Sequence, residues 1–387
     1  MIPDFTPLID RLQSGVLVPL KRAFVGKDDV VDLMSVCLIA GENLFILGPP
    51  GTAKSALVHE LGKRLEGQTF EYLLTRFTEP NELFGPFDIR KLRDGVLETN
   101  IDGMLPEASL VFLDELLNAN SAILNSLLSV LNERVLRRGR ETLQLPVLMA
   151  VGASNHLPED DALRALFDRF LLRVRSDNVG DDGLIDVLRA GWNLESRQNG
   201  GTASGQILSL DEINQLRSLI GQVDLSTVET QYVDLVVRLR TMGIQISDRR
   251  AVKVQRLIAA SAILCGRTQA HPSDLWVLAH IWDIEEQREL LRSAVREILD
   301  ANPADDATKV HPRAESPDLP NPDELLGELD RVIADAQPFL TSGENLPNAI
   351  ADRLSAVENR TQWLANDEQR NFLTEKVADA WIQIQQT

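Results

Sequence analysis

Cysteine is scarce in this chain of 387 residues, which contains only Cys37 and Cys265. Both lie in apolar helical patterns, so we predict that they are small buried residues of a protein in a reducing compartment. The five histidines and two cysteines show no zinc-ligand spacing. We therefore expect neither a disulfide framework nor a structural metal.

Basic residues and long apolar runs are also lacking. The chain has 39 Lys and Arg against 58 Asp and Glu, a formal net charge of −19. This balance argues against a broad nucleic-acid-binding surface, because such surfaces gain affinity from cations. No run approaches the ~18 apolar residues of a membrane helix, and the first segment has no cleavable apolar core. The sequence thus predicts a cytoplasmic protein, and its length predicts two or three domains.

A phosphate-binding loop is predicted where the apolar strand at residues 43–47 runs into the sequence GPPGTAKS. In such loops, backbone N–H groups converge on a polyphosphate and the next helix points its positive end at the anion. Lys54 is predicted to reach the β- and γ-phosphates, and Ser55 to hold Mg²⁺. Ala53 replaces the usual glycine, and we expect a negative φ there, which tolerates a methyl group. The predicted nucleotide-binding residues of this loop are Gly48, Pro49, Pro50, Gly51, Thr52, Ala53, Lys54, Ser55 and Ala56.

A second apolar strand, residues 110–113, ends in two carboxylates, Asp114 and Glu115. Such a pair at the tip of a parallel strand suits the chemistry of a bound triphosphate. Asp114 is predicted to bind the nucleotide and its Mg²⁺, usually through water. Glu115 is predicted to polarise a water for attack on the γ-phosphate.

Two further polar residues follow apolar segments. Asn155, after the strand at 147–153, is predicted to bond the γ-phosphate or the attacking water; alternatively it is a turn residue before His156. Arg169 is a candidate to act in trans on a neighbouring subunit's γ-phosphate, a role worth ~10³–10⁵ in rate. The alternative is a surface arginine paired with Asp168 or Glu159.

Arginines are concentrated at two other places. Ser247 is predicted to cap a helix whose first turn holds Arg249 and Arg250. Cations are disfavoured at that end of a helix, which suggests an anionic partner. A hairpin is predicted around Gly139, with arginines at positions 137, 138 and 140. On its own, this pattern indicates a solvated turn.

The order of the elements predicts an α/β fold. Strand candidates near 44–47, 70–74, 110–113, 147–153 and 170–175 alternate with helices in residues 1–178. This alternation indicates a five-stranded parallel sheet with helices on both faces. Between residues 77 and 103 the pattern predicts a β-hairpin inserted into a helix.

The remainder of the chain is predicted to be helical. Residues 179–298 form a helical lid, interrupted by a polar loop at 195–205. Residues 299–322 are acidic and proline-rich, which predicts a linker. Residues 323–387 form a short helical segment, too small for a robust core, which we expect to pack on the rest of the chain or on a partner.

Together these segments resemble the AAA+ ATPases, and within them the MoxR family, most closely its RavA-like branch. The resemblance spans roughly residues 1–290. It rests on GPPGTAKS, RFTEPNELFGPFDI, LPEASLVFLDEL, AILNSLLSVLNER, the strand ending at Asn155, FDRF and ISDRRA. It implies a Walker A at Lys54 and Ser55, a Walker B at Asp114 and Glu115, sensor 1 at Asn155, an arginine finger at Arg169, and sensor 2 at Arg249 or the adjacent Arg250.

The resemblance also implies a function. It suggests a helix-2 insert at 77–103 and a pre-sensor hairpin around Gly139, which would line a central pore if it is not a solvated turn. It also suggests an ATP- and Mg²⁺-dependent ATPase that assembles into a hexameric ring. Such a ring remodels or activates a client protein, commonly with a von Willebrand factor A domain (vWA) partner. Alternatives are a nucleic-acid motor, a metal-chelatase motor subunit and a non-hydrolysing scaffold; Glu115 and Arg169 argue against the last.

Overall fold

Five parallel strands form the central sheet of the protein. This computed structural model describes residues 5–87, 99–138, 141–158, 161–180, 183–200, 208–303, 308–315, 322–342, 348–361 and 367–385. The sheet has the order β2-β3-β6-β1-β7. Every residue of β1 and β6 is buried, as expected for strands covered on both faces. The predicted sheet is confirmed, with strands β1 (Leu44–Leu47), β2 (Thr69–Leu73), β3 (Leu110–Asp114), β6 (Met149–Ser154) and β7 (Leu172–Arg175).

The strand register defines two edges of this sheet. Leu44 of β1 lies opposite Val151 and Leu172 at one end of the strand, and Leu47 lies opposite Ser154 at the other. Because the strands are parallel, the segments that follow β1, β3 and β6 all leave at one edge, which we call the carboxyl edge. The segments that enter the strands lie at the opposite, amino edge. Ligands of open α/β sheets bind at the carboxyl edge.

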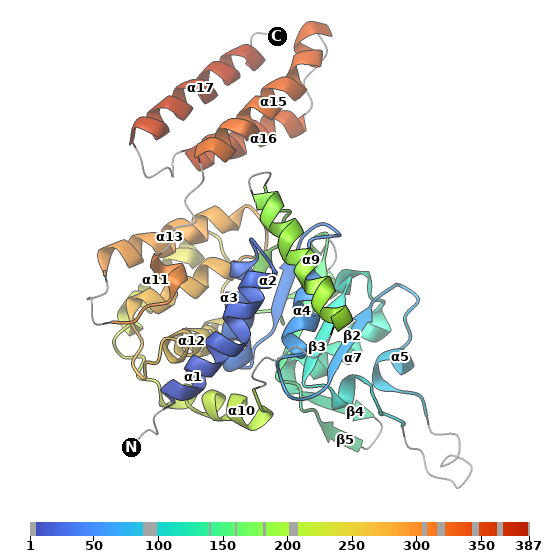
Figure 1. Cartoon of the computed structure of the whole chain (residues 1–387). Helices are drawn as coiled ribbons and strands as arrows, with labels where there is room; N and C mark the ends of the chain where they lie inside the picture. The colour runs from blue at the N-terminus through green and yellow to red at the C-terminus, as the bar shows by residue number, and fades with distance from the viewer. Residues whose placement is uncertain are drawn as a thin grey trace. The chain divides into compact units, whose positions relative to one another are not determined.

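Helices pack against the sheet and against one another (Figure 1). The helix α3 (Asp28–Ala40) is buried from Val30 to Ala40. It contacts β1 and β7 on one side and the helices α10 and α12 on the other. A helix that is apolar all round fits such a position between layers. Among the described residues, the other α-helices before the lid are α1 (Thr6–Leu12), α2 (Val18–Ala23), α4 (Lys54–Gly62), α5 (Pro80–Phe84), α7 (Ser121–Glu133) and α8 (Asp161–Phe167), with a π-helical stretch at Gln13–Leu17.

A helical lid follows the sheet, as predicted. Ser247 caps α12 by accepting a hydrogen bond from the Arg250 N–H, which confirms the predicted helix start. No helix in the described part of the chain is both long and apolar enough to cross a membrane. The lid elements are α10 (Leu210–Ser218), α11 (Glu229–Thr241), α12 (Asp248–Leu264), the 3₁₀ helix η6 (Pro272–His280) and α13 (Gln287–Ala301).

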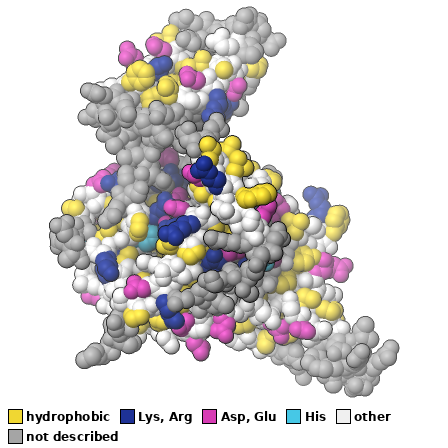
Figure 2. All heavy atoms as spheres, in the orientation of Figure 1, with side chains coloured by type: hydrophobic (Ala, Val, Ile, Leu, Met, Phe, Trp, Pro, Cys, Tyr) yellow, Lys and Arg dark blue, Asp and Glu magenta, His cyan; other side chains and the backbone are white. Residues whose placement is uncertain are grey.

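The helix α9 (Leu184–Gly200) replaces the first part of the loop predicted at 195–205. The Ser196 hydroxyl bonds the Trp192 carbonyl 2.8 Å away, so this polar residue is accommodated inside the helix. Residues 201–207 lie outside the described residues. Four exposed apolar side chains follow one another along α9, where apolar side chains are visible in Figure 2: Leu184, Ile185, Leu188 and Trp192.

The predicted hairpin around Gly139 is present as β4 (Val135–Arg138) and β5 (Glu141–Gln144). Arg137 pairs with Glu133 at 2.5 Å. Gly139 and Arg140 at its tip lie outside the described residues. Most of the predicted insert at 77–103 also lies outside them, apart from α5 and an antiparallel bridge between Phe87 and Thr99 at its base.

Residues 308–315 of the segment predicted as a linker pack against the first unit, so the prediction was wrong for these residues. Residues 308–315 belong to the first compact unit, Met1–Glu315, and end in α14 (Pro312–Glu315). His311 stacks on Trp276 with ring centroids 4.5 Å apart, and Arg313 pairs with Asp29 and Asp32. Composition alone could not reveal this packing, because the acidic residues that pair with Arg313 lie some 280 positions earlier in the chain.

The second unit, Ser316–Thr387, consists of α15 (Pro322–Ser342), α16 (Asn348–Thr361) and α17 (Asp367–Gln385). These three helices share a core of their own, which includes Leu329, Leu354 and Leu373. The sequence predicted the helices but not that they would bury this core among themselves.

Candidate nucleotide site

The phosphate loop occupies the carboxyl edge, between β1 and α4. The Gly48 N–H bonds the Ser154 carbonyl at 3.0 Å, which continues the sheet into the loop. A Cβ on Gly48 would lie 2.2 Å from the Ser176 carbonyl oxygen, so only glycine fits there. Gly51 has a φ of +84°, and Thr52 Oγ1 bonds the Pro49 carbonyl at 3.0 Å. The loop therefore has the tight backbone that a phosphate cradle needs.

The backbone of Ala53 differs from the prediction. Its φ is +62°, in the left-handed region, whereas we expected a negative value. The expectation failed because Ala53 is the N-cap of α4 and lies outside the helical backbone. A left-handed backbone costs a residue with a side chain roughly 1–2 kcal/mol.

Lys54 lies buried over the loop that precedes it. Its Nζ donates to the carbonyls of Gly48 (2.8 Å) and Pro49 (2.9 Å). A second lysine, Lys27, lies close by and was missed from the sequence, where a lone lysine before a helix carries no signal. Burial lowers the pKa of Lys27, the charge of Lys54 lowers it further, and Asp177 opposes both. Lys27 Nζ also bonds the Asp177 carbonyl.

The two carboxylates stand where β3 leaves the sheet. Asp114 lies opposite Leu73 of β2, and its Oδ1 accepts the Glu115 N–H at 3.0 Å. Glu115 has a φ of +50°, and its Oε2 lies 3.4 Å from Asn118 Nδ2. A non-glycine residue in this conformation is strained, and such strain concentrates at functional sites.

Asn155 completes this edge. It follows β6, which lies between β1 and β3, and its side chain is exposed. The adjacent turn is held by a 3.4 Å contact between the His156 N–H and Ser154 Oγ. The phosphate loop, the carboxylates and Asn155 thus follow three adjacent strands at one edge. The Ser55 hydroxyl and the Asp114 carboxylate are the hard oxygen ligands that Mg²⁺ prefers, so these residues fit a magnesium nucleotide.

Arg169 lies at the opposite, amino edge. Its carbonyl accepts from Asn43 Nδ2 at 3.0 Å, and Asn43 is the residue that enters β1. Arg169 Nη1 pairs with Asp168 at 2.8 Å, which is the ion pair foreseen as the alternative. Gly48 leaves β1 at the far end, so about 16 Å of strand separates the two edges. Arg169 therefore lies far from the phosphate loop of its own chain.

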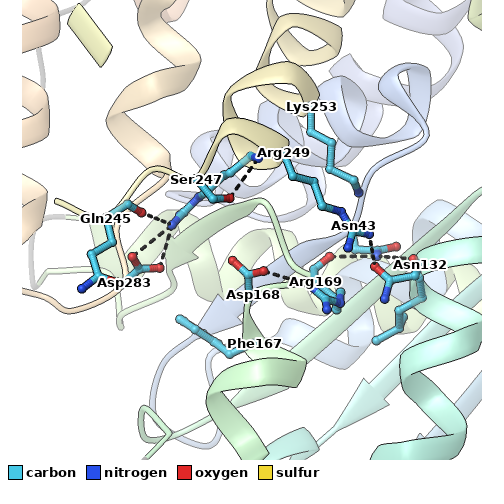
Figure 3. Close-up of polar contacts among 12 residues, drawn as sticks. Asn43, Asn132, Phe167, Asp168, Arg169, Gln245, Ser247, Arg249, Lys253 and Asp283 are labelled. Atoms are coloured by element: carbon cyan, nitrogen blue, oxygen red, sulfur yellow. Dashed lines mark hydrogen bonds and ion pairs between the residues drawn. The ribbon is translucent and has the colours of Figure 1, made fainter. Parts of the chain in front are cut away.

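The two adjacent arginines of α12 make different contacts. Arg250 is buried, with Nη1 3.0 Å from both oxygens of Asp283. Arg249 is exposed, and its Nη2 bonds Asn132 Oδ1 at 2.9 Å (Figure 3). Arg249 and Arg169 line the same small pocket. These two arginines therefore lie together at the amino edge, and Lys54 is not among the residues that line this pocket. Sequence reasoning missed Asn132 and Asp283, which belong to no recognisable local pattern.

Family models match most of the first unit. Residues 10–218, more than half of the chain, match the family described as "MoxR domain in the MoxR-vWA-beta-propeller ternary systems". Residues 213–295 match the AAA lid domain.

Individual proteins agree with these matches. The chain is 36% identical to the uncharacterized proteins MJ0079 and MJ0812 of Methanocaldococcus jannaschii, over 68% of this chain and 68% and 69% of theirs. It is 30% identical to chaperone MoxR1 of Mycobacterium tuberculosis, over 42% of each chain. A crystal structure of a candidate ATPase from Cytophaga hutchinsonii has the same fold, with a TM-score of 0.63 and 19% identity over 77% of this chain and 96% of that one. With its α/β domain, helical lid and family match, the chain belongs to the MoxR family of AAA+ proteins.

Proposed function

We propose that this protein hydrolyses ATP at the carboxyl edge of its sheet. Lys54 exchanges its bonds to the loop carbonyls for the β- and γ-phosphates, and Ser55 and Asp114 hold Mg²⁺. The ion neutralises charge on the phosphates when bound. Glu115 accepts a proton from the attacking water, and Asn155 orients that water or the γ-phosphate. The strained backbone at Glu115 supports this assignment.

The ring mechanism rests on one observation, the position of Arg169 and Arg249 at the amino edge. Neither arginine faces the phosphate loop of its own chain, so the site is completed by the amino edge of another copy. Such a head-to-tail contact repeats around a closed ring. We propose a hexamer, the number implied by the family resemblance. The exposed apolar stripe on α9 is consistent with a surface that is covered on assembly.

We further propose that the ring remodels or activates a client protein together with a vWA partner. The support is the matched family, whose description places its MoxR domains in systems with vWA and β-propeller components. Membership of the RavA-like branch stays a proposal based on the motifs. We also propose that this work takes place in the cytoplasm.

The direct test is turnover measured against protein concentration, with light scattering on the same samples. Activity per subunit should rise as rings form, and Arg169→Ala should bind ATP but hydrolyse it about a thousandfold more slowly. Arg238→Ala, which removes an exposed lid arginine paired with Glu297, is the matched control and should hydrolyse normally. Full turnover by a stable monomer would overturn the proposal.

A further inference from the structure

Asp283 joins the two segments that carry the amino-edge arginines. It follows the buried Trp282 in the connection between η6 and α13. Its Oδ1 lies 2.9 Å from Nη1 of Arg173 on β7, and both of its oxygens lie 3.0 Å from Nη1 of Arg250 on α12. One carboxylate thus serves two guanidinium groups from different parts of the fold.

Arg173 ties this carboxylate to the turn that carries Arg169. The Arg173 side chain is fully buried and donates to the carbonyls of Phe167 (3.3 Å) and Trp282 (2.7 Å). Its guanidinium carbon also lies 4.1 Å from the centre of the Phe167 ring. Phe167 begins the turn Phe167–Phe170, closed by a 3.0 Å backbone bond. A shift of Arg173 would therefore move the backbone of Arg169.

Arg250 ties the same carboxylate to Arg249. Arg250 lies in the first turn of α12, and it also donates to the Gln245 carbonyl at 3.3 Å. Because Arg249 is its neighbour in the same helical turn, the Arg250–Asp283 pair determines the position from which the Arg249 side chain extends from the lid. Asp283 is half-buried beside the cavity of about 930 Å³ between α8, β7 and the lid, which gives the lid room to move when the bridge is broken.

The bridge is electrostatically dependent on Asp283. Two buried cations share it, and the Nε atoms of Arg173 and Arg250 have no hydrogen-bond partner. Burial lowers the pKa of Arg173 to about 9, and the nearby Arg250 contributes to that shift. Without the carboxylate, two like charges would face each other in a desolvated place, and the segments bearing them would separate.

We propose that Asp283 is a positioning residue that fixes the positions of Arg169 and Arg249 relative to each other, so that both reach the neighbouring subunit's γ-phosphate together. The inference rests on the proposed trans action of Arg169. It assigns to the Arg173–Asp283–Arg250 bridge the coupling between lid position and hydrolysis in the next subunit. ATP binding at the chain's own carboxyl edge is left unchanged by this role.

Asp283→Asn in the full chain tests the proposal, because it keeps the side-chain volume and removes the charge. Turnover should fall about a hundredfold, the usual effect of a small misplacement of a catalytic group. Affinity for a fluorescent ATP analogue should stay within about twofold of the unaltered protein. Asp283→Glu should recover part of the activity. Glu285→Gln, which removes the more exposed core–lid pair of Arg175 and Glu285, is the matched control and should hydrolyse normally.

Mixing distinguishes a positioning role from general damage. Asp283→Asn subunits should regain hydrolysis with Glu115→Gln subunits, which contribute an intact amino edge, and should regain none with Arg169→Ala subunits. Unchanged turnover in Asp283→Asn, or no recovery with Glu115→Gln, would overturn the inference. If Arg169→Ala hydrolyses normally, the proposed function itself fails, whatever Asp283 does. Arg250→Gln, which leaves a neutral Arg173–Asp283 pair, provides a second variant with the same expected outcomes.

Discussion

Two residues of the proposed site combine a side chain with a left-handed backbone, Ala53 with φ +62° and Glu115 with φ +50°. Their places in the nucleotide site were predicted from the sequence because the phosphate loop and the carboxylate pair are local patterns. Their backbone conformations were not, because a φ angle depends on how the loop meets the following element. For Glu115 the proposed catalytic role gives a reason for the strained backbone, whereas the Ala53 side chain is only a methyl group with no proposed role.

We predict that Ala53→Gly stabilises the first unit by about 1 kcal/mol, because glycine adopts a positive φ without a steric penalty. Nucleotide affinity should stay within a few-fold. Urea unfolding measures the change in the free energy of unfolding. Ala56→Gly, three positions later on an exposed part of α4, is the control and should destabilise by about 1 kcal/mol. Destabilisation by Ala53→Gly would contradict the observed backbone.

Glu115→Gln should retain ATP binding and lose most turnover. The loop, Lys54 and the Asp114 carboxylate are unchanged, but an amide cannot accept the proton of the attacking water. Lys54→Ala should instead weaken binding itself. A filter-binding assay with labelled ATP and a phosphate-release assay separate the two effects. Near-normal turnover in Glu115→Gln would remove Glu115 from the mechanism.

Among the helices and strands, sequence patterns predicted those whose burial follows from their own apolar residues. They failed for segments whose burial depends on partners that are distant in the sequence. The strands β1, β3 and β6 were predicted because they are continuous apolar runs between turn residues. Residues 308–315 were assigned to a linker because nothing local shows that His311 meets Trp276. The two arginines of α12 could not be told apart either, because Asp283 is 33 residues from Arg250.

The docking of His311 predicts a pH dependence of stability. Burial lowers the pKa of His311 to about 4, with Lys21 and Arg313 adding to the effect and Asp32 opposing it. The unfolded chain takes up this proton near pH 6.5, so stability is complete above that pH and is lost as the pH falls towards 4. From pH 7 to 5 the loss from this group should be about 2 kcal/mol.

His311→Gln should remove this contribution, so its unfolding free energy should change less between pH 7 and 5 than that of the unaltered protein. Urea unfolding at the two pH values measures the difference. His59→Gln, at an exposed position on α4, is the control and should leave the pH dependence unchanged. An identical pH dependence in His311→Gln would show that the buried histidine does not resist protonation.

At the scale of the whole molecule, the two edges of one sheet carry complementary halves of a proposed active site. The carboxyl edge has the phosphate loop and the carboxylates, and the amino edge has Arg169 and Arg249. The trans role of Arg169 was predicted from its place in the sequence. The grouping of Arg249 with it was not, because only the fold shows which edge the first turn of α12 reaches.

ATP hydrolysis by mixtures of Arg169→Ala and Glu115→Gln subunits is the most direct test of whether Arg169 completes the active site of a neighbouring subunit. Each variant alone should be nearly inactive, because every interface in its ring lacks either the arginine or the carboxylate. In mixed rings, an interface can combine the intact Glu115 of one subunit with the intact Arg169 of its neighbour. Mixing should therefore restore hydrolysis, with a maximum near equal amounts of the two variants. Activity that stays at the level of the separate variants, although co-purification of differently tagged variants shows that mixed rings have formed, would contradict it.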